Sequence, residues 1–261
     1  MNLSLQGKNA WVGGASAGIG RAVALELAQL GANVTLVART EATLQATLEQ
    51  LDTTLGQQHQ LAIADYRDPD ALREQVQAVL QQKNLHVLVN NTGGPPGGPI
   101  TDATAVAFTE AFQQHLLCNH LLAQAVLPGM KKSGFGRIIN VISTSVKEPL
   151  DGLGVSNTTR WAVAGWAKTL ANEVARFGIT VNNVLPGYTR TGRLQSLIER
   201  QAAAKGMDTE QLEEQWRHHT PALRFADPEE VAAAVAFLAS PAASYINGVN
   251  LPVDGGRTKS L

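Results

Sequence analysis

A cluster of glycines near the start of the chain has the residue types and spacing that could hold a phosphate group. The apolar run that begins at Asn9 breaks at Gly14, Gly18 and Gly20, and an amphipathic helical pattern follows. Glycine lets the backbone approach a ligand closely, and the N–H groups and dipole of the following helix attract an anion. The pattern predicts a pyrophosphate-binding loop made of Gly14, Ser16, Ala17, Gly18, Ile19 and Gly20. The alternative is a glycine turn without a ligand, because a glycine pattern alone is a weak signal.

The end of the second predicted strand, Asn33–Ala38, bears on the choice of cofactor. In dinucleotide-binding folds that select NAD, a carboxylate at this point accepts a hydrogen bond from the ribose 2′-hydroxyl. Residues 32–40 contain no carboxylate, and Arg39 follows the strand directly. A guanidinium there suits a 2′-phosphate, with Arg21 as a second candidate. We therefore expect NADP rather than NAD, the alternative being that Arg39 is a solvated loop cation.

Strand and helix patterns alternate along the whole chain. After the first strand, which starts at Asn9, strands are predicted at residues 33–38, 60–64, 86–90, 137–142, 180–185 and 248–253. Helices are predicted at residues 41–55, 69–82, 105–132, 154–177 and 228–239, with a polar helical insertion before the last of them. This alternation predicts an α/β fold: a doubly wound, Rossmann-type parallel sheet of about seven strands with helices on both faces. No linker or repeat is apparent, so we expect one domain over residues 1–261.

Composition restricts the class of partner. The 261-residue chain has a formal net charge of −1, which favours neither nucleic acid nor a membrane surface. No apolar run approaches the length of a membrane span, and no signal-peptide pattern precedes the first strand. Cys118 is the one cysteine, which excludes an internal disulfide and a thiolate metal cluster. We expect a cytoplasmic protein that binds a small-molecule substrate and no metal.

Longer motifs spread over nearly the whole chain resemble one enzyme family. They are the glycine loop, Asn90-Asn91-Thr92-Gly93, GRIINVIS at residues 136–143, GWAKTLANEVARFGITVNNVLPG at 165–187 and RFADPEEVAAAVAFLASPAASYINGVNLPVDGG at 224–256. Together they resemble the short-chain dehydrogenase/reductase family, and in particular its 3-oxoacyl-carrier-protein reductase branch. The resemblance implies an oxidoreductase that uses a nicotinamide cofactor. It also implies cofactor contacts from Asp65, Asn91, Gly93, Arg160, Pro186, Gly187 and Thr189.

The catalytic positions implied by the resemblance hold different residues in this chain. The family uses a Ser after the fifth strand, a Tyr on the next helix, a Lys one turn further and an Asn on the preceding long helix. The matching positions are Ser143, Ser156, Arg160 and His115. An aliphatic hydroxyl does not readily supply a proton at neutral pH, and arginine cannot hand one on. Arg160 can still bind ribose hydroxyls, or a carboxylate or phosphate on the substrate.

Two other side chains are weaker candidates for the missing proton donor. Histidine has a pKa suited to acid–base chemistry, but the position of His115 in relatives lies behind the Lys, away from the substrate. We therefore favour a helix histidine whose hydrogen bonds are satisfied within the protein. Tyr188 follows the sixth strand, where packing is the favoured role. The excursion from Arg190 to about Leu223 resembles the family's substrate lid. Within it Trp216, His218 and His219 could face a ligand, although we favour solvated surface histidines.

Two predicted helices, at residues 105–132 and 154–177, are apolar on more than one face. The resemblance implies that these helices form a four-helix interface between subunits. We therefore expect a homodimer or homotetramer, with a thick core as the alternative.

Two functions remain open at this point. The first is an NADP(H)-dependent oxidoreductase that acts on an unknown carbonyl or alcohol substrate through an atypical active site. The second is a catalytically silent dinucleotide-binding protein that serves as a sensor, scaffold or partner subunit. Ser143 and the lid favour the first function, and the replaced Tyr–Lys pair favours the second.

Overall fold

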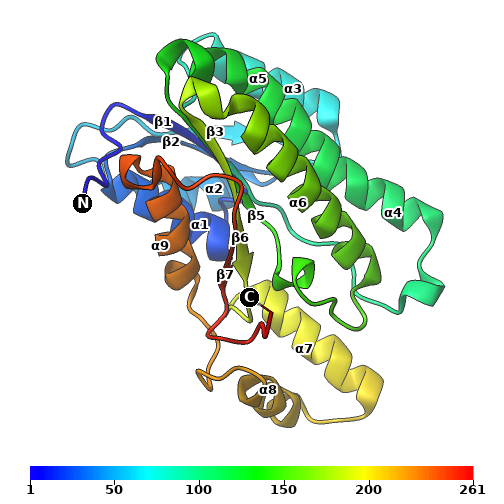
Figure 1. The fold of residues 1–261 in the computed structure, drawn as a ribbon. Coiled ribbons are helices and arrows are strands. Elements are labelled where there is room, and N and C mark those ends of the chain that lie inside the picture. Colours follow the sequence, from blue (N-terminus) through cyan, green and yellow to red (C-terminus); the bar gives the residue numbers. More distant parts are fainter. Residues whose placement is uncertain (261) are drawn as a thin grey trace.

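The strands of the computed structural model, which describes residues 1–260, form one parallel sheet (Figure 1). In chain order they are β1 (Asn9–Gly13), β2 (Asn33–Ala38), β3 (Gln60–Ile63), β4 (Val87–Asn90), β5 (Gly136–Val141), β6 (Ile179–Pro186) and β7 (Asn250–Val253). Their order across the sheet is β3-β2-β1-β4-β5-β6-β7, and every neighbouring pair is parallel. The predicted doubly wound sheet is confirmed.

The strand order reverses at β1, which pairs with β2 on one side and with β4 on the other. Val12 of β1 lies opposite Leu36 of β2 and Val89 of β4. The connections that leave β1 and β4 therefore run in opposite directions, and a crevice opens between them at the carboxyl ends of the strands. The glycine loop follows β1 directly, so it lies at this crevice.

Helices cover both faces of the sheet, as predicted. One face packs against α1 (Gly18–Gln29), α2 (Glu41–Leu48) and α9 (Pro228–Ala239). The other packs against α3 (Pro69–Leu80), α5 (Cys118–Ser133) and α6 (Gly154–Val174), with α4 (Ala105–Phe112) leading into α5 (Figure 1). Successive side chains of β1 point to opposite faces of the sheet, so Val12 packs with the first group of helices and Trp11 with the second.

Several helix bounds differ from the predicted ones for local reasons. The helix α2 ends at Leu48 instead of residue 55, because Asp52 accepts a hydrogen bond from the Thr54 N–H at 2.7 Å in a turn that replaces the last helical turns. The predicted helix at 105–132 is interrupted by a π-helical turn, Gln113–Leu117, between α4 and α5. The last residues of the helix predicted to end at 177 form a short 3-10 turn instead. No helix among residues 1–260 is long and apolar enough to cross a membrane.

The predicted helical insertion after β6 holds two helices, α7 (Gly192–Lys205) and α8 (Thr209–His218). They share a small apolar cluster that includes Leu194, Ile198 and Leu212 and is separate from the two layers on the sheet. Figure 1 shows both helices at the edge of the molecule, beyond the carboxyl ends of the strands. This insertion corresponds to the segment predicted as a lid.

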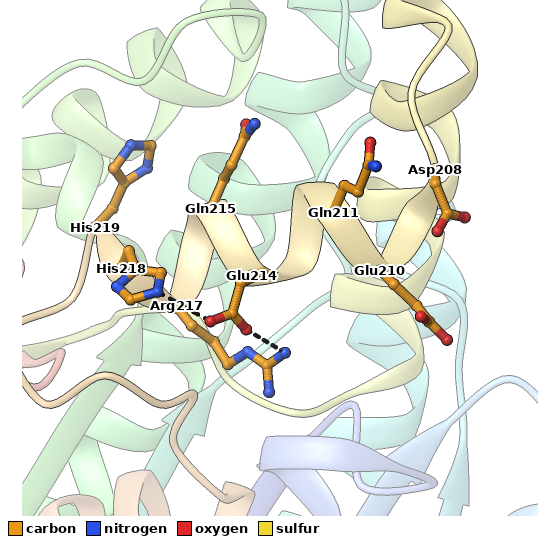
Figure 2. A pocket seen from close by; sticks show the side chains of 8 residues that line it. All are labelled: Asp208, Glu210, Gln211, Glu214, Gln215, Arg217, His218 and His219. Carbon is orange, nitrogen blue, oxygen red and sulfur yellow. Dashed lines mark ion pairs between the residues drawn. The ribbon is translucent and has the colours of Figure 1, made fainter.

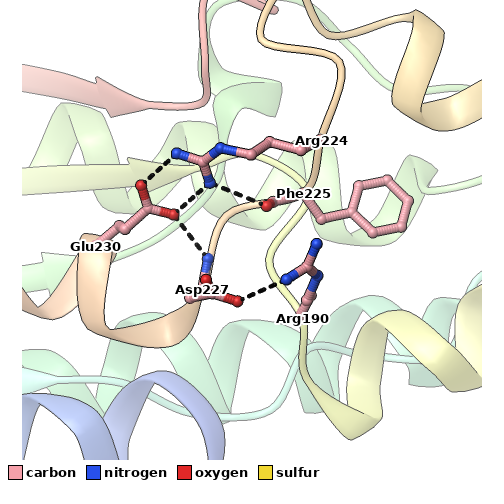
Figure 3. A network of polar contacts seen from close by, with 5 residues as sticks. All are labelled: Arg190, Arg224, Phe225, Asp227 and Glu230. Carbon is pink, nitrogen blue, oxygen red and sulfur yellow. Dashed lines mark hydrogen bonds and ion pairs between the residues drawn. The ribbon is translucent and has the colours of Figure 1, made fainter.

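Both ends of the insertion are fastened to the start of α9, as Figure 3 shows. Arg190 pairs with Asp227 at 3.1 Å, and Arg224 pairs with Glu230 at 2.6 Å. Glu230 also accepts a hydrogen bond from the Asp227 N–H at 2.9 Å. The Arg224 side chain, and then this N–H, lower the pKa of Glu230 to about 2. The base of the insertion is therefore tied to the body of the protein at both ends.

Candidate active site

A cleft of about 1330 Å³ opens at the carboxyl ends of the strands. It collects most of the predicted site residues from segments that are far apart in the sequence. The lining includes Gly14, Ser16, Ala17, Gly18, Ile19, Arg39, Asp65, Asn91, Gly93, Ser143, Ser156, Arg160, Pro186, Gly187 and Thr189. Two predicted site residues, Gly20 and His115, are buried and do not line the cleft.

The loop between β1 and α1 has a backbone that larger residues would strain or block. Gly14 and Gly18 have φ angles of +60° and +53°, in the left-handed region. A Cβ on Gly20 would overlap the carbonyl oxygen of Gly14. The Asn91 Nδ2 donates to the Gly13 carbonyl oxygen at 3.0 Å, which fastens the loop to the end of β4. No side chain caps the start of α1, so its first N–H groups can bind an anion.

Two arginines and one carboxylate line the end of the cleft beside β2 and β3. Arg67 and Asp65 form an ion pair of 2.6 Å, and the Arg67 hydrogen bonds lower the pKa of the Asp65 carboxyl. Arg39 also lines this end, and it has no ion pair among residues 1–260. Arg21 is different, because it donates to Gln50 and does not line the cleft. The predicted arginine at the end of β2 thus lines the cleft without an ion pair, whereas Arg21 does not line it.

The other end of the cleft holds the predicted catalytic side chains. Ser143 follows β5, and its Oγ accepts a hydrogen bond from the Ser145 N–H at 3.0 Å. This leaves the Ser143 hydroxyl proton free to be donated into the cleft. Ser156 and Arg160 lie one turn apart on α6, and both line the cleft as well. The fold therefore brings two hydroxyl groups and one guanidinium to the same end of the cavity.

Arg160 is a buried cation with little local compensation. Its residue is 6 % exposed, and its Nη1 donates to the Val141 carbonyl oxygen at 3.5 Å. Burial, followed by repulsion from Arg193, lowers the pKa of Arg160 to about 10. The guanidinium therefore remains charged at neutral pH.

His115 lies in the π-helical turn between α4 and α5 and is fully buried. Its Nδ1 is 2.6 Å from the Thr92 Oγ1, and its Nε2 has no hydrogen-bond partner. Burial, with repulsion from Arg160 and Arg193, lowers the pKa of His115 to about 2. The imidazole is therefore neutral at pH 7, and only one of its two nitrogens is satisfied.

Aromatic side chains form one wall of the cleft. Tyr188 stacks on Trp216, with ring centroids 4.7 Å apart, and meets the edge of Phe225 at 5.7 Å. The Arg257 guanidinium lies 4.6 Å from the centroid of the Tyr188 ring. The predicted packing role of Tyr188 is therefore observed, and both Tyr188 and Trp216 also line the cavity.

Comparisons with known proteins agree with this geometry. Residues 14–258 match the family described as enoyl-(acyl carrier protein) reductase. A 3-oxoacyl-[acyl-carrier-protein] reductase of Vibrio cholerae is 35% identical over 257 residues, which cover 97% of this chain and 98% of the relative. The chain belongs to the short-chain dehydrogenase/reductase family. L-sorbose reductase from Gluconobacter frateurii, solved with NADPH and L-sorbose, superposes with a TM-score of 0.92 at 31% identity and covers all of both chains. Actinorhodin polyketide ketoreductase with NADPH gives a TM-score of 0.91 at 32% identity, over 97% of this chain and 98% of that one.

Three further arginines, which the sequence motifs did not indicate, line the cleft of this short-chain dehydrogenase/reductase. Arg67 lies two residues after Asp65, Arg193 lies in the first turn of α7, and Arg257 follows β7. The signal for Arg193 was its position shortly after Thr189, a predicted cofactor residue. No pattern in the sequence relates Arg257 to the site, since only the strand order β6-β7 brings it there.

A separate hollow of about 820 Å³ runs along α8 in the insertion after β6. Figure 2 shows Glu214 at its centre, held by Arg217 at 2.6 Å and by His218 at 2.9 Å. His218 therefore faces this outer hollow, whereas His219 also borders the main cleft. The hollow contains none of the predicted cofactor or catalytic residues. Within residues 1–260 no group of three or more His, Cys, Asp or Glu side chains could hold a metal ion.

Proposed function

We propose that this short-chain dehydrogenase/reductase is an NADP(H)-dependent oxidoreductase that interconverts a carbonyl compound and an alcohol. The observation that carries the proposal is the continuity of one cleft. The glycine loop after β1 and the serine after β5 line the same cavity, as hydride transfer between a bound nicotinamide and a substrate requires. The protein would hold both molecules, and the cofactor would supply the hydride.

The residues that line the cleft beside β2 support NADP over NAD. No carboxylate follows β2 to meet a ribose 2′-hydroxyl, and Arg39 lines the cavity without an ion pair. Arg67 lies nearby with its orientation fixed by Asp65. The two structurally similar enzymes named above were solved with NADPH. Arg39 is proposed to bind the 2′-phosphate and Asp65 to contact the adenine.

Proton delivery is proposed to differ from the family pattern, because Ser156 and Arg160 stand at the positions of its Tyr and Lys. Neither residue is a proton donor at neutral pH, and the low pKa of His115 keeps that side chain neutral. We propose that Ser143 hydrogen-bonds the carbonyl oxygen and stabilises the developing alkoxide. Water that enters the open cleft would then supply the proton.

A second function, dinucleotide binding without turnover, is suggested by the same replacement of the Tyr–Lys pair by Ser156 and Arg160. A sensor, scaffold or partner subunit would need the glycine loop and Arg39 but no proton relay. The relatives named above are reductases, which favours the enzyme. The lid between residues 190 and 223 also favours it, because a lid that covers a substrate is of use to a catalyst.

NADPH oxidation by purified protein with a panel of ketones and aldehydes tests the proposal. We expect turnover with at least one compound, and Ser143→Ala should reduce kcat by about 100-fold, as loss of an oxyanion donor does. Thr158→Ala removes a hydroxyl from the same helix as Ser156 but outside the cleft, so it is the matched control. Tight NADPH binding with no turnover on any compound would favour the silent protein instead.

A further inference from the structure

Two arginines without carboxylate partners approach each other across the cleft. Arg160 belongs to α6 and Arg193 to the lid helix α7. Their Nη2 atoms lie 3.9 Å and 3.6 Å from the point that a Cβ on Gly94 would occupy. Both side chains line the cleft, so two positive charges are held beside one small region of the cavity.

The burial of Arg160 makes this arrangement costly unless an anion is present. A buried charge needs a partner of opposite sign or several hydrogen bonds, since it has lost its water. Arg160 is 6 % exposed, and within residues 1–260 it makes one long hydrogen bond, to the Val141 carbonyl oxygen. Most of its five N–H groups therefore remain for a ligand.

Arg193, on α7, likewise has no carboxylate partner within residues 1–260. Its Nη2 donates to the Pro95 carbonyl oxygen at 2.5 Å, a neutral partner. The carboxylates that line the cleft are Asp65, Asp102, Glu110, Glu148 and Asp151. None of them forms an ion pair with Arg160 or Arg193 among residues 1–260. The fold thus holds two like charges together and provides no counter-charge of its own.

We propose that Arg160 and Arg193 form a binding site for an anionic group, a carboxylate or a phosphate, on the substrate. This proposal rests on the proposed oxidoreductase function and names its substrate class. Guanidinium groups bind both kinds of anion through paired, charge-assisted hydrogen bonds. An anion between them would also join α6 to α7, so substrate binding would draw the lid onto the body of the protein.

The substrate, rather than the cofactor, fits this position better. The pyrophosphate already has the N–H groups at the start of α1, and the 2′-phosphate has Arg39. Thr191, near the start of the lid, faces the glycine loop at Gly18, whereas Arg193 reaches towards the loop after β4 at Pro95. That loop also meets the lid at Leu197, because a Cβ on Gly97 would lie 3.8 Å from the Leu197 Cδ2. Arg193 therefore belongs to the wall formed by this loop and the lid.

Calorimetric titration of the NADP⁺-loaded protein with matched pairs of small carbonyl compounds tests the proposal. The pairs are pyruvate and methyl pyruvate, benzoylformate and methyl benzoylformate, and dihydroxyacetone phosphate and dihydroxyacetone. We expect at least one anion to bind ten-fold or more tightly than its neutral counterpart. The carboxylate and phosphate pairs distinguish the two possible sources of the negative charge.

The Arg193→Gln variant is expected to lose this preference by ten-fold or more, whereas Arg193→Lys retains part of it. Lys205→Gln removes a charge from the same helix outside the cleft and should behave as the wild type. NADPH affinity of Arg193→Gln should stay within about two-fold of the wild type. Inorganic phosphate carries the anionic group without a substrate skeleton, and it should raise the melting temperature of the NADP⁺ complex in the wild type more than in Arg193→Gln.

Two results would overturn the proposal. One is NADPH binding with no preference for any anion over its neutral counterpart and no effect of phosphate. The other is a loss of NADPH affinity in Arg193→Gln as large as the loss of anion affinity, which would assign Arg193 to the cofactor. A protein that binds no NADPH at all would instead refute the proposed oxidoreductase function, so the two failures are distinguishable.

Discussion

The Thr92 Oγ1 lies 2.6 Å from the Nδ1 of His115, at a point where the long helix opens into a π-helical turn. The hydroxyl comes from the segment after β4, and the imidazole from the helix that covers it. This bond satisfies one ring nitrogen and leaves the Nε2 buried without a partner. The result is a histidine held neutral beside the cationic Arg160, which lowers its pKa further.

His115 should make the protein sensitive to mild acid. Its pKa is about 2 in the folded protein, against 6.5 for the ordinary side chain. The unfolded chain therefore binds a proton below pH 6.5 that the folded chain refuses, so stability falls as the pH falls from 6.5 towards 2. The loss is up to about 1 kcal/mol between pH 6.5 and 5.5. Urea unfolding of His115→Asn should show a shallower decline; an unchanged slope would show that His115 titrates normally.

Arg39 should determine cofactor preference. We expect the wild type to bind NADPH more tightly than NADH, and Arg39→Ala to lose most of that difference, about 1–3 kcal/mol for a lost charged hydrogen bond. Arg21→Ala is the matched control, since Arg21 is held by Gln50 outside the cleft lining. Fluorescence titration gives both affinities, and a wild type that prefers NADH would refute the assignment.

Restoring the family's Tyr and Lys on α6, in place of Ser156 and Arg160, should increase reductase activity. Ser156→Tyr together with Arg160→Lys would put a phenol and an ammonium one helical turn apart, next to Ser143. We expect the double variant to gain NADPH-dependent reduction of an activated ketone, with smaller gains in either single variant, because the Lys acts through the Tyr pKa. A triple variant that also carries His115→Asn should reduce the ketone at least as fast as the double variant. A wild type as fast as the double variant would mean that the protein has its own efficient proton donor.

The helices α4 to α6 should carry a subunit interface. Val106, Leu117 and Trp161 are 62 %, 56 % and 51 % exposed there, which leaves a large apolar area in water. We expect a dimer or tetramer by light scattering at micromolar concentration, and dissociation in Leu117→Glu. Tyr245→Glu changes a fully exposed apolar side chain elsewhere and is the control. A mass near 27.7 kDa at every dilution would contradict the interface.

The sequence predicted the sheet well because its signals are local. Glycine spacing, the apolar strands and the helical periodicities each depend on a few neighbouring residues, and the β1–α1 loop and its helix lie where these signals put them. The end of α2 was missed because an aspartate turn at Asp52 competes with the helix over only a few residues. The π-helical turn at His115 was missed because it depends on tertiary packing. The apolar residues around it keep a spacing that also fits a continuous α-helix.

The charge pattern of the site could be predicted only in part. Arg39 and Arg160 follow or match motif positions, so the sequence identified them. Arg193 lies on α7 and Arg257 follows the last strand, so the fold of distant segments sets their positions in the cleft. A single sequence cannot show that a buried arginine lacks a carboxylate partner. For this reason the anion site became apparent only from the structure.

Deuterium transfer tests the central claim most directly. The protein is incubated with NADPH deuterated at C4 of the nicotinamide and with each carbonyl compound of the panel, and the products are analysed by mass spectrometry. We expect deuterium on the carbinol carbon of at least one product, and much less with Ser143→Ala. The Ser156→Tyr/Arg160→Lys variant shows whether the panel contains a compound that fits the cleft. Deuterium transfer by that variant alone, with none by the wild type that binds NADPH, would contradict the account and make this protein a silent dinucleotide-binding member of its family.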